Sequence, residues 1–174
     1  MAATLTLYAI TGASPTYTNI GGLITFCTAD EASPGTEHTI PYPTSGTKRS
    51  YWKNLTLYIT GSFTQVKNIR LFTSGASWTG ITIYCGNETL AIASYQQATG
   101  VEDDSGNEVV TTHDHITAKT DLFTYTYTTP KTVDSTIYTT TGYSKHVVLQ
   151  MDVDSTATLG ALSPKIITWI YDEI

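Results

Sequence analysis

The sequence predicts an all-β protein whose strands pair antiparallel and pack as a two-layered sandwich. Three observations lead to this prediction. Apolar residues repeatedly alternate with threonine or tyrosine at a period of two, the pattern of a strand with one buried face. Threonine, a β-branched residue that suits pleated sheets, is abundant. Short runs of turn-forming residues separate the alternating segments.

The alternation places the strands. It is clearest in four segments, residues 4–9, 55–60, 81–85 and 123–127. In the second of these, Leu55, Leu57 and Ile59 should face inward, while Thr56 and Tyr58 face away from the core. Further strands are expected at residues 20–28, 66–72, 135–139, 147–153 and 165–171.

The connections complete the expected architecture. Residues 29–50 form a long irregular loop, and loops of that length are usually functional or poorly ordered. Residues 88–98 fit a short helix or a strand equally well. No linker or internal repeat divides the chain, so we expect one domain over residues 1–174. Turns at this spacing favour an antiparallel sandwich of about eight to ten strands, jelly-roll or immunoglobulin-like.

The charge balance excludes some partners. The formal net charge is −6 and the pI about 5.0, whereas nucleic-acid binding needs a basic surface that displaces counterions from phosphates. The single basic pair, Lys48 and Arg49, is too short to provide one. Adhesion to an anionic membrane is disfavoured for the same reason. We therefore expect neither nucleic acid nor membrane as a partner.

The first residues and the cysteines indicate the compartment in which the protein folds. The first residues lack the basic and apolar regions of a secretory signal, and no apolar stretch approaches the ~20 residues of a membrane span. We therefore expect folding in a cytoplasm. Cys27 and Cys85 each lie in an apolar segment, so we expect two buried free thiols. A disulfide between them is the alternative.

Motifs for catalysis are missing from the sequence. It has no nucleophile elbow, no phosphate-binding glycine loop, no His-Glu-x-x-His and no Cys-x-x-Cys. We therefore predict that the protein is not an enzyme, and we assign no catalytic, cofactor-binding or metal-binding residues and no cofactor.

Two polar groups leave metal binding open. His113 and His115 would share one side of a strand and hold a transition metal if a third ligand came from His38, His146 or Asp121. The interpretation as a solvated loop that also contains Asp114 is favoured. Residues 102–108 (EDDSGNE) offer oxygens for calcium but lack the ligand spacing of an EF-hand, and such charge runs are usually solvated turns.

Aromatic residues indicate a contact surface. The chain has 12 tyrosines and three tryptophans, and several tyrosines stand beside threonines on the polar side of predicted strands. Cross-strand packing explains any one of them. As a group they favour a protein partner over a small substrate, because tyrosine is an amphipathic side chain suited to interfaces.

Two stretches carry a family resemblance. Residues 51–63 (YWKNLTLYITGSF) and 66–75 (VKNIRLFTSG) form a strand ending in Thr-Gly-x-Phe followed by an Asn-containing strand. Residues 147–152, 155–160 (STATLG) and 169–173 (WIYDE) form a strand, a turn and a terminal strand. Both stretches resemble virion structural proteins of tailed phages. Leu159 departs from the pattern, where a turn former would be expected, and the 29–50 loop has no counterpart in it.

The resemblance implies a β-sandwich in the virus particle, as a decoration, minor capsid or tail-associated component, and it carries over no catalytic residues. We therefore expect a non-enzymatic structural protein that decorates or stabilises a capsid through protein–protein contacts. Its partners would be the major capsid protein or another virion protein, together with further copies of itself. The alternative is a tail-associated receptor- or carbohydrate-binding module in which Trp52, Trp78 and tyrosines stack on sugars. A hydrolase on a sandwich scaffold ranks last.

Two local roles follow from residue chemistry alone. Gly61 can adopt a positive φ that ends one strand tightly, and Phe63 would then fix the turn to the core. The side chain of Asn68 can bond its own backbone as the next strand begins. In the last strand, Ile167, Trp169 and Tyr171 would form one face.

Overall fold

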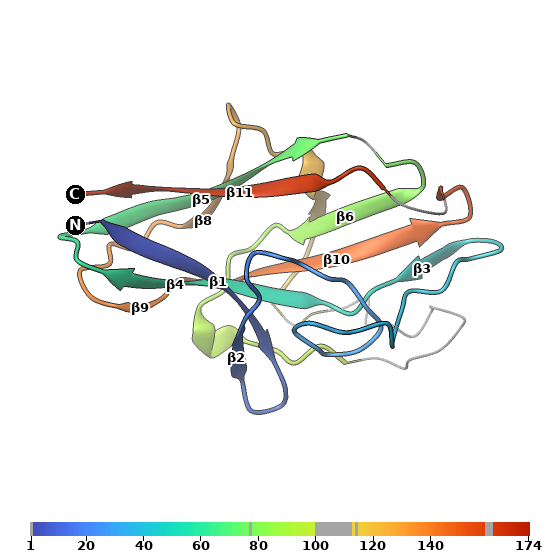
Figure 1. Ribbon diagram of the computed structural model, residues 1–174, viewed down its shortest axis with the longest axis horizontal. Helices are drawn as coiled ribbons and strands as arrows, with labels where there is room; N and C mark the ends of the chain where they lie inside the picture. Colours follow the sequence, from blue (N-terminus) through green and yellow to red (C-terminus); the bar gives the residue numbers. More distant parts are fainter. Residues whose placement is uncertain (1, 77, 100–112, 114, 159–161) are drawn as a thin grey trace.

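The structure is a sandwich of two antiparallel β-sheets, as the sequence predicts (Figure 1). It is a computed structural model that describes residues 2–76, 78–99, 113, 115–158 and 162–174. These residues contain eleven strands, three of which (β3, β7 and β9) are only two or three residues long. None of the described helices is long and apolar enough to cross a membrane.

The larger sheet, sheet A, has eight strands. Six of them follow the order β2-β1-β4-β10-β6-β7, while β3 pairs with β10 and β9 pairs with β4. Their bounds are β1 (Ala3–Thr11), β2 (Thr16–Asn19), β3 (Thr47–Arg49), β4 (Lys53–Gly61), β6 (Ile81–Gly86), β7 (Lys119–Asp121), β9 (Gly142–Tyr143) and β10 (Val147–Asp154).

The smaller sheet, sheet B, has three strands in the order β11-β5-β8. They are β5 (Val66–Gly75), β8 (Lys131–Asp134) and β11 (Lys165–Glu173). The termini lie side by side where β1 and β11 meet, and the two strands diverge away from that end (Figure 1). At the meeting point the backbone N–H of Ala3 donates to Glu173 Oε1 over 2.9 Å.

The main core lies between the two sheets. Leu55, Leu57 and Ile59 are buried in it, which confirms the register predicted for β4. The face of β11 formed by Ile167, Trp169 and Tyr171 also packs on this core, as predicted. The period-two pattern therefore correctly identifies the inner faces of these strands.

The outer face of sheet A is partly covered. A second apolar cluster of Tyr51, Trp52, Leu90, Ala98 and Val148 lies there, beneath the segment that follows β6. Thr56 belongs to this outer face, but it is fully buried, and its hydroxyl donates to Ser144 O, in the segment that follows β9. The expectation that Thr56 faces away from the core holds, but it does not face solvent.

The corner between β4 and β5 carries the chain from sheet A to sheet B. Gly61 has φ +96°, as predicted, and a Cβ there would lie 2.7 Å from the carbonyl oxygen of Ala2. Phe63 packs on the main core, again as predicted. The role predicted for Asn68 is wrong, since its side-chain Nδ2 donates to Asp172 Oδ2 over 2.6 Å instead of to its own backbone. Asn68 has φ +52° beside a β-bulge in the pairing of β5 with β8.

Several predicted elements are absent. Residues 123–127 are not a strand: the Asp121 carboxylate accepts from Phe123 N over 2.9 Å and starts the 3-10 helix η2 (Leu122–Thr124). Residues 20–28 are irregular, since Gly21 and Gly22 both have positive φ and turn the chain. The candidate helix at 88–98 is reduced to the 3-10 helix η1 (Ile92–Ser94).

Two boundaries also differ from the prediction. The strand expected at 135–139 lies earlier, as β8, after which Tyr138 makes only an isolated bridge to Val66. The expected 29–50 loop is irregular up to residue 46, but its end forms β3 and pairs with β10. This loop is therefore anchored to sheet A.

Candidate contact surface

Four tyrosines meet on the outer face of sheet A. We call Tyr8, Tyr17, Tyr58 and Tyr143 the tyrosine patch. They come from four different strands, β1, β2, β4 and β9, which lie side by side in the sheet. Pairing places Tyr58 directly opposite Tyr143 and Tyr8 opposite Thr56, so these side chains stand on the same face.

The four rings form one continuous cluster. Tyr143 is central: its ring centre is 4.3 Å from that of Tyr17, 4.6 Å from that of Tyr58 and 5.6 Å from that of Tyr8. Tyr8 and Tyr58 also make an edge-to-face contact at 5.8 Å. Ring pairs at these distances stabilise one another beyond simple burial, so the patch is a pre-ordered surface.

The patch is uncharged and able to form hydrogen bonds. All four tyrosines are half-buried, and none of their hydroxyl groups bonds to another described residue. Burial raises the pKa of Tyr17 and Tyr143 above the ordinary value for tyrosine, and for Tyr143 the neighbouring tyrosines add to the shift. The hydroxyls of these two are therefore neutral at physiological pH and can both donate and accept.

A partly buried polar contact holds the β1–β2 hairpin that carries Tyr17. The Tyr95 hydroxyl donates to the carbonyl oxygen of Gly12 over 2.9 Å, and the Gly12 N–H donates to Asp30 Oδ2 over 2.8 Å. Burial raises the pKa of Tyr95 and also that of Asp30. Tyr95 lies in the segment for which the sequence left helix and strand open, so its positioning role was missed there.

The other aromatic residues singled out in the sequence lie elsewhere. Trp52 is only 4% exposed, so the expectation that it stacks on a sugar is wrong. Tyr84 lies beneath the Lys119 ammonium at 4.5 Å, and Tyr125 packs on the main core. Trp78 also packs on the main core, beside Phe123, and its indole N–H donates to Ser163 O over 2.8 Å.

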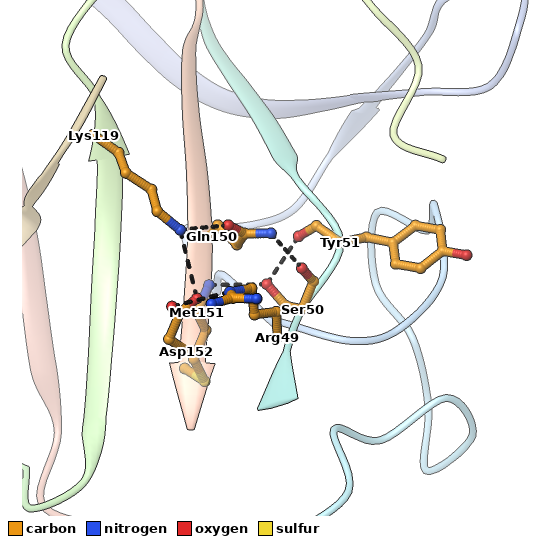
Figure 2. Close-up of polar contacts among 7 residues, drawn as sticks. All are labelled: Arg49, Ser50, Tyr51, Lys119, Gln150, Met151 and Asp152. Atoms are coloured by element: carbon orange, nitrogen blue, oxygen red, sulfur yellow. Dashed lines mark hydrogen bonds and ion pairs between the residues drawn. The ribbon is translucent and has the colours of Figure 1, made fainter. Parts of the chain in front are cut away.

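A polar network occupies the outer face of sheet A nearer β7. Figure 2 shows Lys119 directed at both Gln150 and Asp152, with Nζ 2.8 Å from Gln150 Oε1 and 3.7 Å from Asp152 Oδ1. Arg49 reaches the other oxygen of Asp152 at 3.3 Å. Burial lowers the pKa of Lys119, and Asp152 opposes that shift.

The network joins β3, β7 and β10. Gln150, which is fully buried, donates through Nε2 to Ser50 O over 3.0 Å, and the Ser50 hydroxyl accepts from Met151 N (Figure 2). Each of these polar groups is paired within the network, so we interpret it as a brace for the short strands. Sequence reasoning missed it, because its members come from separate segments.

The histidines were the strongest metal candidates in the sequence. His113 and His115 have ring centres 6.0 Å apart and lie in a turn, not a strand, since Ile116 N donates to His113 O. The backbone N–H of His115 donates to His113 Nδ1 over 3.2 Å, which occupies that nitrogen. Within the described ranges, no three histidine, cysteine, aspartate or glutamate residues lie close enough to hold a metal ion. Asp114 and residues 102–108 lie outside the described residues.

The two cysteines are free and buried, which confirms the prediction for the thiols. Burial raises the pKa of Cys85 to about 12, although nearby Lys131 opposes the shift. The Cys27 thiol donates to Ala29 O over 3.2 Å. The Cys85 thiol is therefore protonated and unreactive in the folded protein.

Fold and patch together define a β-sandwich with an aromatic cluster on the outer face of sheet A. No family model, no curated protein and no solved structure matches the chain.

Proposed function

We propose that this chain is a non-enzymatic structural protein of a viral particle, which decorates or stabilises a capsid through protein–protein contacts. The tyrosine patch is the observation that carries the proposal. Its partner is the major capsid protein or another virion protein, and the chain acts as a homo-oligomer. The location is the virion, after assembly in a host cytoplasm.

The chemistry of the patch suits a protein interface. Tyrosine offers a large contact area for only two side-chain torsions, and its hydroxyl satisfies polar groups of a partner. The patch lies on strands, so its geometry is fixed before binding and little ordering entropy is lost. On a repeating shell, weak contacts of this kind add up through multivalency.

The particle context is supported by the resemblance to tailed-phage virion proteins. Its first stretch forms β4, the corner at Gly61 and β5. Its second stretch includes β10 and β11. The resembling residues thus include strands of both sheets, and they contribute Tyr58 to the patch.

The test replaces exposed parts of the patch. Tyr17→Ala with Tyr143→Ala should abolish cosedimentation with assembled particles and weaken self-association in sedimentation velocity. The matched control is Tyr127→Ala, which removes a tyrosine that is 73% exposed and outside the patch. Thermal melts establish that each variant is folded. Undiminished particle binding by the folded double variant would refute the role of the patch, and absence of the wild-type chain from particles would refute the function.

A receptor- or carbohydrate-binding module of the tail is the second candidate, because half-exposed tyrosine rings also stack on sugars. It predicts that soluble glycans bind the isolated chain and quench tyrosine fluorescence. The Tyr17→Ala/Tyr143→Ala variant would lose that binding, whereas the capsid proposal predicts no glycan response in either protein.

A further inference from the structure

An apolar cleft of about 560 Å³ opens between the two sheets. Its floor comes from the inner face of sheet A and includes Leu7, Ile83 and Met151. Its roof is the inner face of β11, with Ile167, Trp169 and Tyr171. The volume lies within the range of small-molecule sites, and apolar walls with few polar groups are typical of them.

The divergence of β1 and β11 produces this cleft. The strands are tied together near the termini, where the Tyr171 hydroxyl donates to Ala3 O over 3.4 Å. They separate toward Lys165 at the other end of β11 (Figure 1). The segment that contains Gly21 and Gly22 borders the cleft and has no strand pairing. The space is therefore bordered by chain on this side instead of being an open sheet face.

A cation stands among the residues that line this cleft. The Lys165 Nζ lies 3.3 Å from the ring centre of Phe123 and 5.1 Å from that of Trp78, both of which also line the cleft. No carboxylate of the described residues lies within 4 Å of Nζ, and the Asp121 carboxylate acts on its charge only from a greater distance. In the roof, the indole N–H of Trp169 is buried without a hydrogen-bond acceptor among the described residues.

These features specify a ligand by its chemistry. The apolar lining and the volume of about 560 Å³ suit an aliphatic chain, whose burial would be favourable in proportion to the area removed from water. A carboxylate is the group that complements an ammonium without a carboxylate in direct contact, because a charged hydrogen bond is stronger than a neutral one. We propose that the cleft binds a long-chain monocarboxylate, with its alkyl chain between the sheets and its carboxylate at Lys165.

This site is separate from the tyrosine patch. The cleft lies on the inner face of sheet A, and the patch lies on its outer face. The inference therefore does not depend on the proposed function, and either can fail without the other.

The role of the Lys165 charge is tested with dodecanoate and 1-dodecanol, two ligands that share an alkyl chain and differ in the head group. Calorimetric titration of the full chain should show one site that prefers dodecanoate. Lys165→Gln should weaken dodecanoate binding about tenfold and leave dodecanol binding unchanged, since only the charged contact is removed. The matched control, Lys67→Gln, changes a lysine of β5 outside the cleft and should bind both as the wild type does.

The location of the binding site is tested by filling the cleft with a larger side chain. Ile167→Trp should abolish binding of both ligands, whereas Ile166→Trp, at the adjacent position that is 54% exposed, should have no effect. Circular dichroism melts serve to check that both variants fold. The proposal is overturned if the wild type binds neither ligand, if Lys165→Gln binds dodecanoate normally, or if Ile166→Trp and Ile167→Trp behave alike. Binding of an extended apolar peptide in place of both ligands would assign the cleft to a protein strand and overturn it too.

Discussion

Thr56 shows how a residue's surroundings can reverse an expectation drawn from its position in a strand. Alternation places Thr56 on the outer face of β4, and at an exposed position there Thr56→Ala would cost no more than about 1 kcal/mol. In the structure its hydroxyl donates to Ser144 O over 2.8 Å, and the Ser144 hydroxyl accepts from Leu57 N over 3.1 Å. This small network fastens β9, and thus Tyr143, to sheet A.

We now expect Thr56→Ala to lower the free energy of unfolding by about 1–3 kcal/mol, because the buried carbonyl oxygen of Ser144 would lose the Thr56 hydroxyl that donates to it. Leu57→Ala should cost roughly 2–5 kcal/mol, since Leu57 fills the main core. Thr4→Ala, at an exposed position of β1, should change stability by less than about 0.5 kcal/mol. Urea unfolding of the three variants measures these losses of stability. An equal loss in Thr56→Ala and Thr4→Ala would contradict the prediction.

The two thiols give a second prediction at this scale. Cys27 and Cys85 are 2% and 0% exposed, so neither should react readily with a thiol reagent in the native protein. Both should react after addition of denaturant without reductant. Recovery of fewer than two thiols in denaturant would mean that a disulfide forms in the purified protein.

His146 makes stability depend on pH. It is fully buried, and burial first, then nearby His113 and His115, lowers its pKa to about 4 from the ordinary 6.5. Between these values the unfolded chain binds a proton that the folded chain does not. Stability from this residue is therefore complete above about pH 6.5 and is lost as the pH falls toward 4, by at most about 3 kcal/mol.

Replacing the histidine isolates its contribution. His146→Leu has no proton to bind in either state, so its free energy of unfolding should fall less steeply than that of the wild type between pH 7 and pH 4. Chemical denaturation at several pH values in that window gives both slopes. Equal slopes would show that His146 takes up its proton without unfolding.

At the scale of elements, alternation was a good guide wherever a strand pairs along its whole length. β1, β4, β5, β6, β10 and β11 all lie where the sequence placed a strand. It failed at residues 123–127, because the Asp121 side chain caps a 3-10 turn there, and period two cannot register such a cap. It failed at residues 20–28, where two successive glycines turn the chain.

The tyrosine patch was only partly accessible to sequence reasoning. Tyr8 and Tyr58 were recognised as residues on the polar face of strands. Tyr17 and Tyr143 were not, because β2 and β9 are too short for alternation to be recognised. That the four rings meet depends on the strand order β2-β1-β4 and on the pairing of β9 with β4, which are long-range features.

The loop after residue 29 is a structural element as well as a candidate contact. An irregular loop without contacts to the core would tolerate deletion of residues 31–47 without loss of the fold. However, Lys53 is only 4% exposed, and its Nζ donates to Glu31 O and Ala32 O. Ala32 also packs on the main core, and Thr47 pairs with Asp154.

We therefore expect deletion of residues 31–47 to destabilise the protein by roughly 3 kcal/mol or more, because a buried ammonium would lose its acceptors. Combining the deletion with Lys53→Met should restore part of the loss, since an apolar chain of similar length needs no acceptor. Removal of the exposed residues 35–37 alone serves as the control. Thermal melts that show no loss of stability in the 31–47 deletion would mean that the loop does not stabilise the fold.

At the scale of the whole molecule, sheet A separates two surfaces with different chemistry. Its outer face carries the tyrosine patch, made of neutral aromatic groups that suit a protein partner. Its inner face forms the floor of the cleft, and Lys165 is the one charged residue among those that line it. Sheet B, with only three strands, leaves room for that cleft beside β11. If both proposals hold, one sandwich serves two ligands.

This separation predicts that the two functions vary independently. Tyr17→Ala/Tyr143→Ala should reduce particle binding and leave the dodecanoate affinity unchanged, while Lys165→Gln should do the reverse. Combining the three substitutions should give the sum of the separate free-energy changes within about 0.5 kcal/mol, because the sites share no side chain and lie on opposite faces of the sheet. The test measures the affinity of every variant for particles and for dodecanoate. A larger deviation would mean that ligand in the cleft alters the outer face, and the sheet would then couple the two sites instead of separating them.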